Sequence, residues 1–216
     1  MRIDIFSDTI CPWCYIGKKR FEKALAQRSD LALEIHWRAF QLNPDMPEEG
    51  MDRKHYVETK FGGPERARQV YARVASAGSE DDIAFNFEGI VRTPNTVASH
   101  RLIRYAGDQP GGQDAVVEAL FEAYFIRGED IGDLDVLVAA AEQASLDPQA
   151  VREFLASEEH LHAVRAEDVR ARQLGIQGVP FFVIDDKYGI SGAQPPDVFL
   201  QAFDQLTAEV EIDAAE

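Results

Sequence analysis

Residues 2–14 read RIDIFSDTICPWC, and this stretch decides the fold of the chain. Residues 2–7 alternate in character and are rich in Ile and Phe, which is typical of a β-strand. Pro12 suits the first turn of a helix, because its missing N–H needs no partner there. From Pro12 the apolar residues keep a helical period to about Arg28. The pattern therefore predicts a strand, a turn and a helix that begins at a pair of cysteines.

The spacing of the two cysteines indicates redox chemistry. Two residues three positions apart at a helix start lie on one face, within the Cα separation of about 4.4–6.8 Å that a disulfide needs. Cys11 lies where free backbone N–H groups and the helix dipole favour a thiolate. Cys14 lies one turn inside the helix and should be more shielded. We therefore predict that Cys11 attacks a substrate and that Cys14 resolves the mixed disulfide.

Two other interpretations of Cys-Pro-Trp-Cys are weaker. A static disulfide across so short a loop removes little entropy from the unfolded chain. A zinc site needs two further ligands, but the chain has 2 cysteines and its 5 histidines are scattered. His160 and His162 are two positions apart, which points them to different faces of a helix. We expect no metal site, although a structural or zinc-binding module remains the non-enzymatic alternative.

The rest of the chain predicts an α/β fold interrupted by helices. Residues 31–39 alternate as a second strand, so the N-terminal part forms a β-α-β unit. From about residue 43 to about residue 167 helical patterns dominate, and Pro64 and Pro148 fit first helical turns. Strand-like runs return at residues 179–184 and 188–191, followed by a last helix and an acidic tail from about Glu209 that we expect to fray.

Composition excludes several classes of partner. The chain has 216 residues, of which 45% are hydrophobic, so it can bury a large core. A formal net charge of -16, with the acidic residues dispersed, argues against nucleic acid and anionic membranes as partners. No apolar run is long enough to span a bilayer. The segment after Met1 lacks the features of a secretory signal, so we expect a cytoplasmic protein whose cysteines are mostly reduced.

Three segments resemble the DsbA family, in particular its FrnE-like branch. They are FSDTICPWCY at residues 6–15, RAFQLNP at residues 38–44 and GIQGVPFFV at residues 175–183. The resemblance covers nearly the whole chain. It implies a thioredoxin-like fold with a large all-helical insertion domain, and a Cys11/Cys14 redox pair. We therefore expect residues 1–43 and 167–216 to form the thioredoxin-like domain and residues 44–166 the insertion.

The resemblance also implies a cis peptide bond before Pro180, opposite the cysteines. Only about 5–6% of X-Pro bonds in folded proteins are cis, so the residues alone would predict a trans bond. A cis bond would turn the Val179 backbone toward the sulfur pair, where it could bind an extended substrate. The alternative is a proline that merely starts an edge strand.

The same scaffold resembles hydroxychromene-carboxylate isomerases and kappa-class glutathione transferases, which use serine or a similar residue near the position of Cys11. The expected function is thiol-disulfide exchange with a protein or small-molecule substrate. The alternative is a glutathione-dependent isomerase or transferase. We expect no bound cofactor, while glutathione remains a candidate reductant or co-substrate. The residues leave the oligomeric state open, with a homodimer among the possibilities.

Candidate substrate-contacting residues are Pro12 and Trp13 between the cysteines, Val179, and the pair Asn95 and His100. The last two lie in a segment that resembles the family's helix facing the active site, where His100 could assist proton transfer. We favour the structural alternative for them, a helix N-cap and a buried histidine with satisfied partners. Asp8 is either a carboxylate that tunes the sulfurs or a turn residue.

Overall fold

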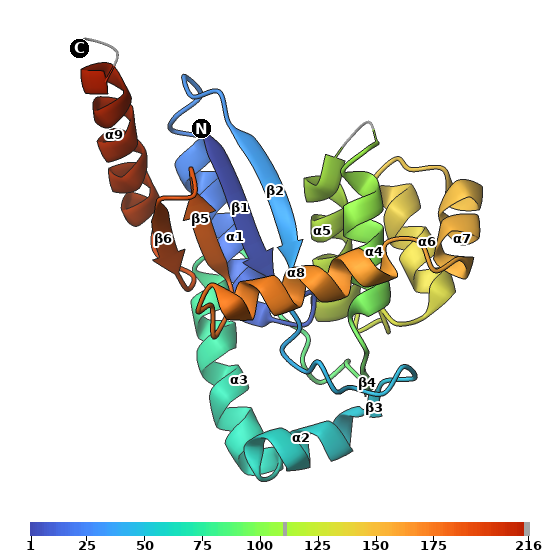
Figure 1. Cartoon of the computed structure of the whole chain (residues 1–216). Helices are drawn as coiled ribbons and strands as arrows, with labels where there is room; N and C mark the ends of the chain where they lie inside the picture. Colours follow the sequence, from blue (N-terminus) through green and yellow to red (C-terminus); the bar gives the residue numbers. More distant parts are fainter. Residues whose placement is uncertain (110–111, 214–216) are drawn as a thin grey trace.

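The computed structural model describes residues 1–109 and 112–213 and contains a four-stranded sheet of order β2-β1-β5-β6. β1 pairs with β2 in parallel, and β5 pairs antiparallel with both β1 and β6. The crossover between β1 and β2 is helix α1, so the predicted β-α-β unit is confirmed (Figure 1). The strands are β1 (Arg2–Ser7), β2 (Glu34–Ala39), β5 (Phe181–Ile184) and β6 (Tyr188–Ser191).

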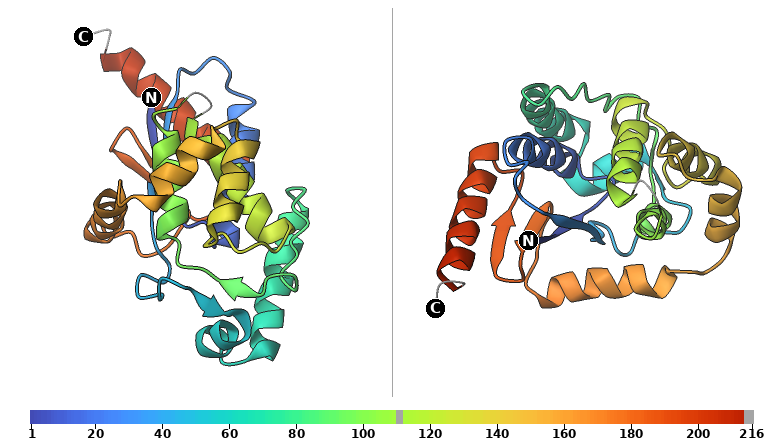
Figure 2. Two further views of the ribbon diagram at one scale, coloured as in Figure 1. Left: turned by 90° about the vertical axis from the view of Figure 1, so that its right-hand side faces the viewer. Right: turned by 90° about the horizontal axis from the view of Figure 1, so that it is seen from above.

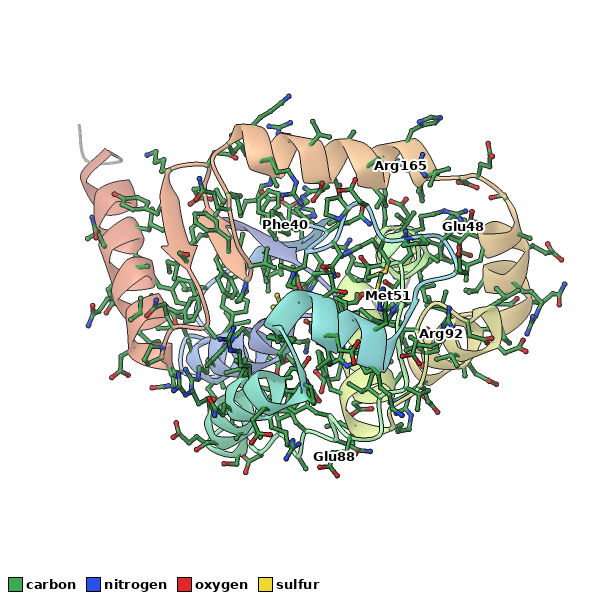
Figure 3. All side chains as sticks on the ribbon, turned by 90° about the horizontal axis from the view of Figure 1, so that it is seen from below. Phe40, Glu48, Met51, Glu88, Arg92 and Arg165 are labelled. Atoms are coloured by element: carbon green, nitrogen blue, oxygen red, sulfur yellow. The ribbon has the colours of Figure 1, made fainter. Side chains whose placement is uncertain are left out.

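Side chains alternate across this sheet and build two apolar clusters. Ile3, Ile5 and Phe182 point toward α1 (Pro12–Leu25) and α9 (Pro196–Asp213), where Phe21 packs against them. On the other face Phe6 and Phe40 pack under α8 (Leu161–Gln173), and Phe40 is labelled below that helix in Figure 3. Figure 2 shows α1 and α8 on opposite sides of the sheet. Successive side chains of β1 thus point to opposite faces of the sheet, and helices cover the apolar side chains on both faces.

The insertion is helical apart from one short ladder. β3 (Met51–Asp52) pairs antiparallel with β4 (Arg92–Thr93), which corrects the expectation of an all-helical segment. Strands of two residues leave no alternating pattern in the sequence. The other elements are α2 (Arg53–Phe61), α3 (Pro64–Ser79), α4 (Val97–Ala106), α5 (Gly112–Phe121), a π-helical turn η1 (Glu122–Ile126), α6 (Leu134–Gln143) and α7 (Pro148–Ala156).

Several predicted boundaries are confirmed, and others shift. Pro64 and Pro148 start their helices, and Asp147 caps the second one through its side chain. Gly175, with a φ of 82°, follows α8 as the predicted stop. α1 ends at Leu25 rather than near Arg28, and α8 runs without a break across the expected domain boundary at residue 166. α9 stays helical to Asp213, past the expected start of fraying, and residues 214–216 lie outside the described part.

One core joins the sheet layer to the insertion. Tyr15 of α1 stacks on Phe121 of α5, with ring centroids 5.0 Å apart, and Phe125 of η1 lies 6.4 Å from the same ring. The aromatic side chains at residues 121–125 therefore pack in the core. In the described part of the chain no helix is long and apolar enough to cross a membrane.

A buried lysine fastens α1 to α5 next to this stack. The Lys18 side chain is 2% exposed, and its Nζ contacts Glu22 and lies 3.1 Å from Asp114 and 2.9 Å from Glu118. Burial would lower the pKa of Lys18, but the three carboxylates outweigh it and raise the pKa above its ordinary value. The cation is thus held charged between the two helices.

Candidate active site

The two cysteines occupy the start of α1, as predicted. Cys11 is the N-cap with an extended backbone (φ -94°, ψ 110°), and Pro12 takes the first helical position. The Cys11 N–H donates to the Asp8 carbonyl at 3.0 Å, which closes the turn between β1 and α1. Both residues carry free thiols in the structure, Cys11 4% exposed and Cys14 1% exposed. Cys14 is therefore the more shielded sulfur.

The surroundings of Cys14 oppose its ionisation. Burial raises the pKa of the Cys14 thiol well above its ordinary value, and the adjacent Cys11 sulfur raises it further. The Ser7 hydroxyl and the Asp8 backbone act in the opposite direction without reversing the shift. Cys14 is consequently protonated at neutral pH.

The Val179–Pro180 peptide bond is cis, which confirms the expectation drawn from the resemblance. Its carbonyl side faces the dithiol, and the Cys11 Sγ donates to the Val179 oxygen at 3.5 Å. The Pro180 carbonyl accepts from the Gly192 N–H at 2.8 Å, which ties this loop to the end of β6. The structure therefore brings Cys11, Cys14, Val179 and Pro180 into one site.

Gly17 is a site residue that the sequence reasoning missed. A Cβ placed on Gly17 would lie 2.8 Å from the Cγ of Pro180, closer than real Cβ contacts come. α1 can therefore approach the cis-proline loop only with glycine at this position. The sequence does contain a signal for this contact, because Gly17 lies inside a helical pattern. A glycine inside a helix costs about 1 kcal/mol of stability relative to alanine and usually allows close packing.

Trp13 stands out from the surface beside the sulfurs. It is 40% exposed, while Trp37 on β2 is 5% exposed and belongs to the core. A large exposed ring next to a thiol offers apolar area for another molecule to pack on.

Asp8 and His100 lie beneath the cysteine turn rather than at its surface. Asp8 is fully buried, and its Oδ2 accepts from the Leu42 N–H at 2.7 Å. Its Oδ1 lies 3.5 Å from the Nε2 of His100, which is 4% exposed and comes from α4. Within the described part of the chain neither of these two atoms has a hydrogen-bond partner. His100 therefore faces the buried side of the active-site turn.

Asn95 is occupied by the backbone around it. Its Nδ2 donates to the Met46 carbonyl at 2.7 Å, and its Oδ1 accepts from the Val97 N–H at 3.0 Å. The N-cap of α4 is Thr96, so Asn95 precedes the N-cap and still bonds the N–H of Val97, the first residue of the helix. Both ends of its amide are used, which leaves a substrate little to bind there.

A groove lies next to the site, and Tyr56 of α2 is one of its lining residues. Burial raises the pKa of Tyr56, the charges of Asp8 and Cys11 add to this effect, and Asn43 and Arg53 oppose it. Tyr56 is therefore close to the active-site turn, although no sequence motif singled it out. The groove has a volume of about 430 Å³ and is lined by Leu42, Asn43, Pro44, Asp45, Met46, Pro47, Met51, Tyr56, Thr59 and Lys60.

A larger cavity of about 730 Å³ lies between α2, α3 and residues 87–91. Its lining includes Arg53, Tyr71 and Phe87 but none of the residues around the sulfurs. The larger cavity is therefore separate from the cysteine turn.

Comparisons with known proteins agree with this geometry. The family model of the DSBA-like thioredoxin domain matches residues 2–204. A crystal structure of a probable DsbA oxidoreductase from Streptomyces coelicolor is 35% identical, with a TM-score of 0.86, covering 97% of this chain and 91% of that one. The uncharacterized protein YwbO of Bacillus subtilis is 26% identical over 203 residues, which is 94% of this chain and 95% of YwbO.

More distant structures share the fold alone. A 2-hydroxychromene-2-carboxylate isomerase is 19% identical with a TM-score of 0.70, covering 100% of this chain and 98% of that one. The cytosolic disulfide reductase DsbM of Pseudomonas aeruginosa, solved with GSH, is 15% identical with a TM-score of 0.65, covering 97% and 100%.

Proposed function

Because this chain belongs to the DSBA-like thioredoxin domain family and is thus a DsbA-family oxidoreductase, we propose that it exchanges disulfides through Cys11 and Cys14 opposite the cis Pro180. The observation that carries the proposal is the 3.5 Å approach of the Cys11 Sγ to the Val179 oxygen, at a helix N-terminus. A helix N-terminus stabilises negative charge, which suits an attacking sulfur, and we propose that the Val179 backbone pairs with an extended substrate.

The exchange runs in two balanced steps. The Cys11 thiolate attacks a substrate disulfide, so one substrate sulfur leaves as a thiolate and a mixed disulfide forms. Cys14 then loses its proton and attacks the Cys11 sulfur, which releases the second substrate thiol and leaves the Cys11–Cys14 disulfide. The substrate gains two electrons and the dithiol loses them. Run in reverse, the same steps oxidise a substrate. Trp13, Pro12 and Val179 surround the reacting sulfur and are proposed to contact the substrate.

Insulin reduction tests this function. We expect Cys11→Ser to abolish the reduction, because it removes the attacking sulfur. Cys14→Ser should still form the mixed disulfide but accumulate it, which intact-mass analysis detects. Tyr105, which stacks on Phe154 in the insertion, gives a control through Tyr105→Phe. Equal rates for the wild type and Cys11→Ser would remove Cys11 from the mechanism.

Glutathione is proposed as the reductant that restores the dithiol. The support is the groove beside Tyr56, which offers Lys60 and the amide of Asn43 to a charged peptide-like thiol. A titration with reduced and oxidised glutathione, read by thiol-labelling mass, measures the equilibrium directly. The protein would have to interconvert reversibly between dithiol and disulfide. Turnover of a glutathione-dependent reaction that survives Cys14→Ser would instead favour the isomerase or transferase alternative.

A cytoplasmic setting is part of the same proposal. The structural neighbour DsbM is a cytosolic disulfide reductase, and a reducing compartment suits a protein that donates electrons to disulfides. Trapping thiols in intact cells with an alkylating reagent would test this, because Cys11 and Cys14 should then be found mostly reduced.

A further inference from the structure

The proposed exchange leaves one step without a chemical agent, the removal of the proton from Cys14. The Cys14 side chain is 1% exposed, so bulk water does not reach its sulfur. Asp4, the acidic residue of β1, forms ion pairs with Arg38 at 2.5 Å and with Arg2 at 2.9 Å. Both oxygens of this carboxylate are therefore engaged by arginines.

Three buried polar atoms that lack hydrogen-bond partners among the described residues lie on the segments around the cysteine turn. The Ser7 hydroxyl is near enough to the Cys14 thiol to lower its pKa, and in the described part of the chain its Oγ has no partner at hydrogen-bonding distance. The Nε2 of His100 and the Oδ1 of Asp8 are also unpartnered within that part, and they lie 3.5 Å apart. Buried polar atoms are rarely left unpaired in native proteins, so a cluster of them suggests a catalytic role or bound water.

A small cavity connects these groups. Its volume is about 10 Å³, close to the space that one water molecule needs. Ser7 and His100 both line it, so a proton leaving the Ser7 side has a short path to the imidazole. Arg104 and Glu167 also line it, and the Arg104 side chain is 37% exposed. The remaining lining residues are Trp37, Arg38, Ala39 and Ile103.

We propose that His100, paired with Asp8, accepts the proton of Cys14 through the Ser7 hydroxyl when Cys14 attacks the mixed disulfide. The inference rests on the proposed function and assigns the second step to a histidine of the insertion. Cys14 gives its proton to the Ser7 oxygen, Ser7 passes a proton across the cavity to the Nε2 of His100, and the Cys14 sulfur bonds to the Cys11 sulfur. The substrate thiolate leaves, and the imidazolium is stabilised by the Asp8 carboxylate.

The charged groups around the imidazole fit this assignment. Asp8, in the turn after β1, faces the His100 imidazole, and Cys11 and Cys14 follow that turn. The other charged residues of the cavity are Arg104 on α4, Arg38 on β2 and Glu167 on α8. Glu167 binds both arginines, at 3.4 Å from Arg38 and 2.6 Å from Arg104, so the carboxylate of Asp8 is left to balance a protonated His100.

Stopped-flow reaction with Ellman's disulfide separates the two steps in one trace. The first thionitrobenzoate leaves when Cys11 attacks the reagent, and the second leaves when Cys14 attacks the mixed disulfide. We expect His100→Asn to leave the first release unchanged. The second release should slow by about 10²-fold, the usual contribution of a positioned acid or base. Its rate should then rise with hydroxide concentration, because hydroxide is left to take the Cys14 proton in the variant.

Ser7→Ala provides a second variant in case His100→Asn does not fold, and it should slow the second release alone. Tyr105→Phe is the matched control, because Tyr105 lies on α4 but stacks on Phe154 away from the cavity. The proposal is overturned if both variants release the second thionitrobenzoate within about twofold of the wild-type rate, or if both releases slow equally. Loss of the first release in Cys11→Ser, with no effect of His100→Asn, would uphold the proposed function and remove only this inference.

Discussion

At the scale of single residues, the two identical side chains of Cys11 and Cys14 have different surroundings. Cys11 caps a helix beside the Val179 carbonyl, whereas Cys14 is enclosed one turn further in. The enclosure raises the pKa of Cys14, so its proton is bound more tightly in the folded protein than in the unfolded chain. That difference couples the folding of the reduced protein to pH.

The reduced protein should therefore lose stability as the pH rises above the unfolded thiol pKa of about 8.5. Below that pH both states hold the Cys14 proton. Above it the unfolded state releases the proton while the folded state keeps it, so the free energy of unfolding falls by up to about 1.4 kcal/mol per pH unit. Urea titrations of the wild type and Cys14→Ala from about pH 7 to 10 measure this difference.

The comparison of the two proteins isolates Cys14 from other groups. Burial also raises the pKa of Tyr15 and Tyr124, but both tyrosines titrate in each protein and cancel in the difference. If the free energy of unfolding changed with pH in the same way for the wild type and Cys14→Ala, the assignment of a raised pKa to Cys14 would be contradicted.

At the scale of elements, α1 joins the site to the rest of the molecule. Its N-terminus holds the sulfurs, Gly17 lies against Pro180, and Lys18 is bound to carboxylates of α5. These contacts fall on successive faces of one helix. The position of the cysteines relative to the cis-proline loop is thus set by how closely α1 can pack on it.

Gly17→Ala should separate helix propensity from packing. Alanine is favoured inside a helix by about 1 kcal/mol, but the new Cβ would meet the Pro180 ring at 2.8 Å. Overpacking of this kind costs about 1–3 kcal/mol, so we expect a net loss of stability. Displacement of Pro180 should also lower the rate of insulin reduction by roughly tenfold or more, since misplacements of about 1 Å reach 10²-fold.

Gly178→Ala is the matched control for stability, because a Cβ at Gly178 has no atom within 4 Å. Thermal unfolding of the two variants next to the wild type gives the comparison. If Gly17→Ala were as stable and as active as the wild type, the close approach of α1 to Pro180 would not matter to the site.

At the scale of the whole molecule, the insertion and the sheet layer share one core. Glu167 of α8 accepts from the Ala39 N–H of β2 at 3.1 Å and from Arg104 of α4 at 2.6 Å. Asp168 accepts from the Gln41 N–H at 2.8 Å. Together with the stack of Tyr15 on Phe121, these contacts join segments that are far apart in the sequence.

We expect the protein to unfold in a single cooperative transition. In a Trp13→Phe background, tryptophan fluorescence comes from Trp37 and reports the sheet, while far-ultraviolet circular dichroism reports mainly the helices of the insertion. The two melting curves should therefore coincide. Glu167→Ala should shift both curves to lower temperature together. Separate transitions, with the helical signal lost while Trp37 stays buried, would show that the two parts fold independently.

The local patterns of the chain determined the β-α-β unit, the start of α1 at the cysteine turn and the hairpin of β5 and β6. These depend on nearest neighbours: alternation, a proline in the first helical turn, and turn residues. The cysteine spacing also pointed to the attacking and resolving thiols, and the family resemblance pointed to the cis Pro180. All of these signals are contained within a few consecutive residues.

The tertiary structure alone decided what surrounds the sulfurs. It placed His100 against Asp8, brought Tyr56 to the groove, satisfied both ends of the Asn95 amide locally, and set Gly17 against Pro180. Each of these depends on contacts between residues distant in the sequence, and no periodicity encodes such contacts. Burial and its effect on the Cys14 proton arise in the same way, because a single segment cannot exclude water from its own side chains.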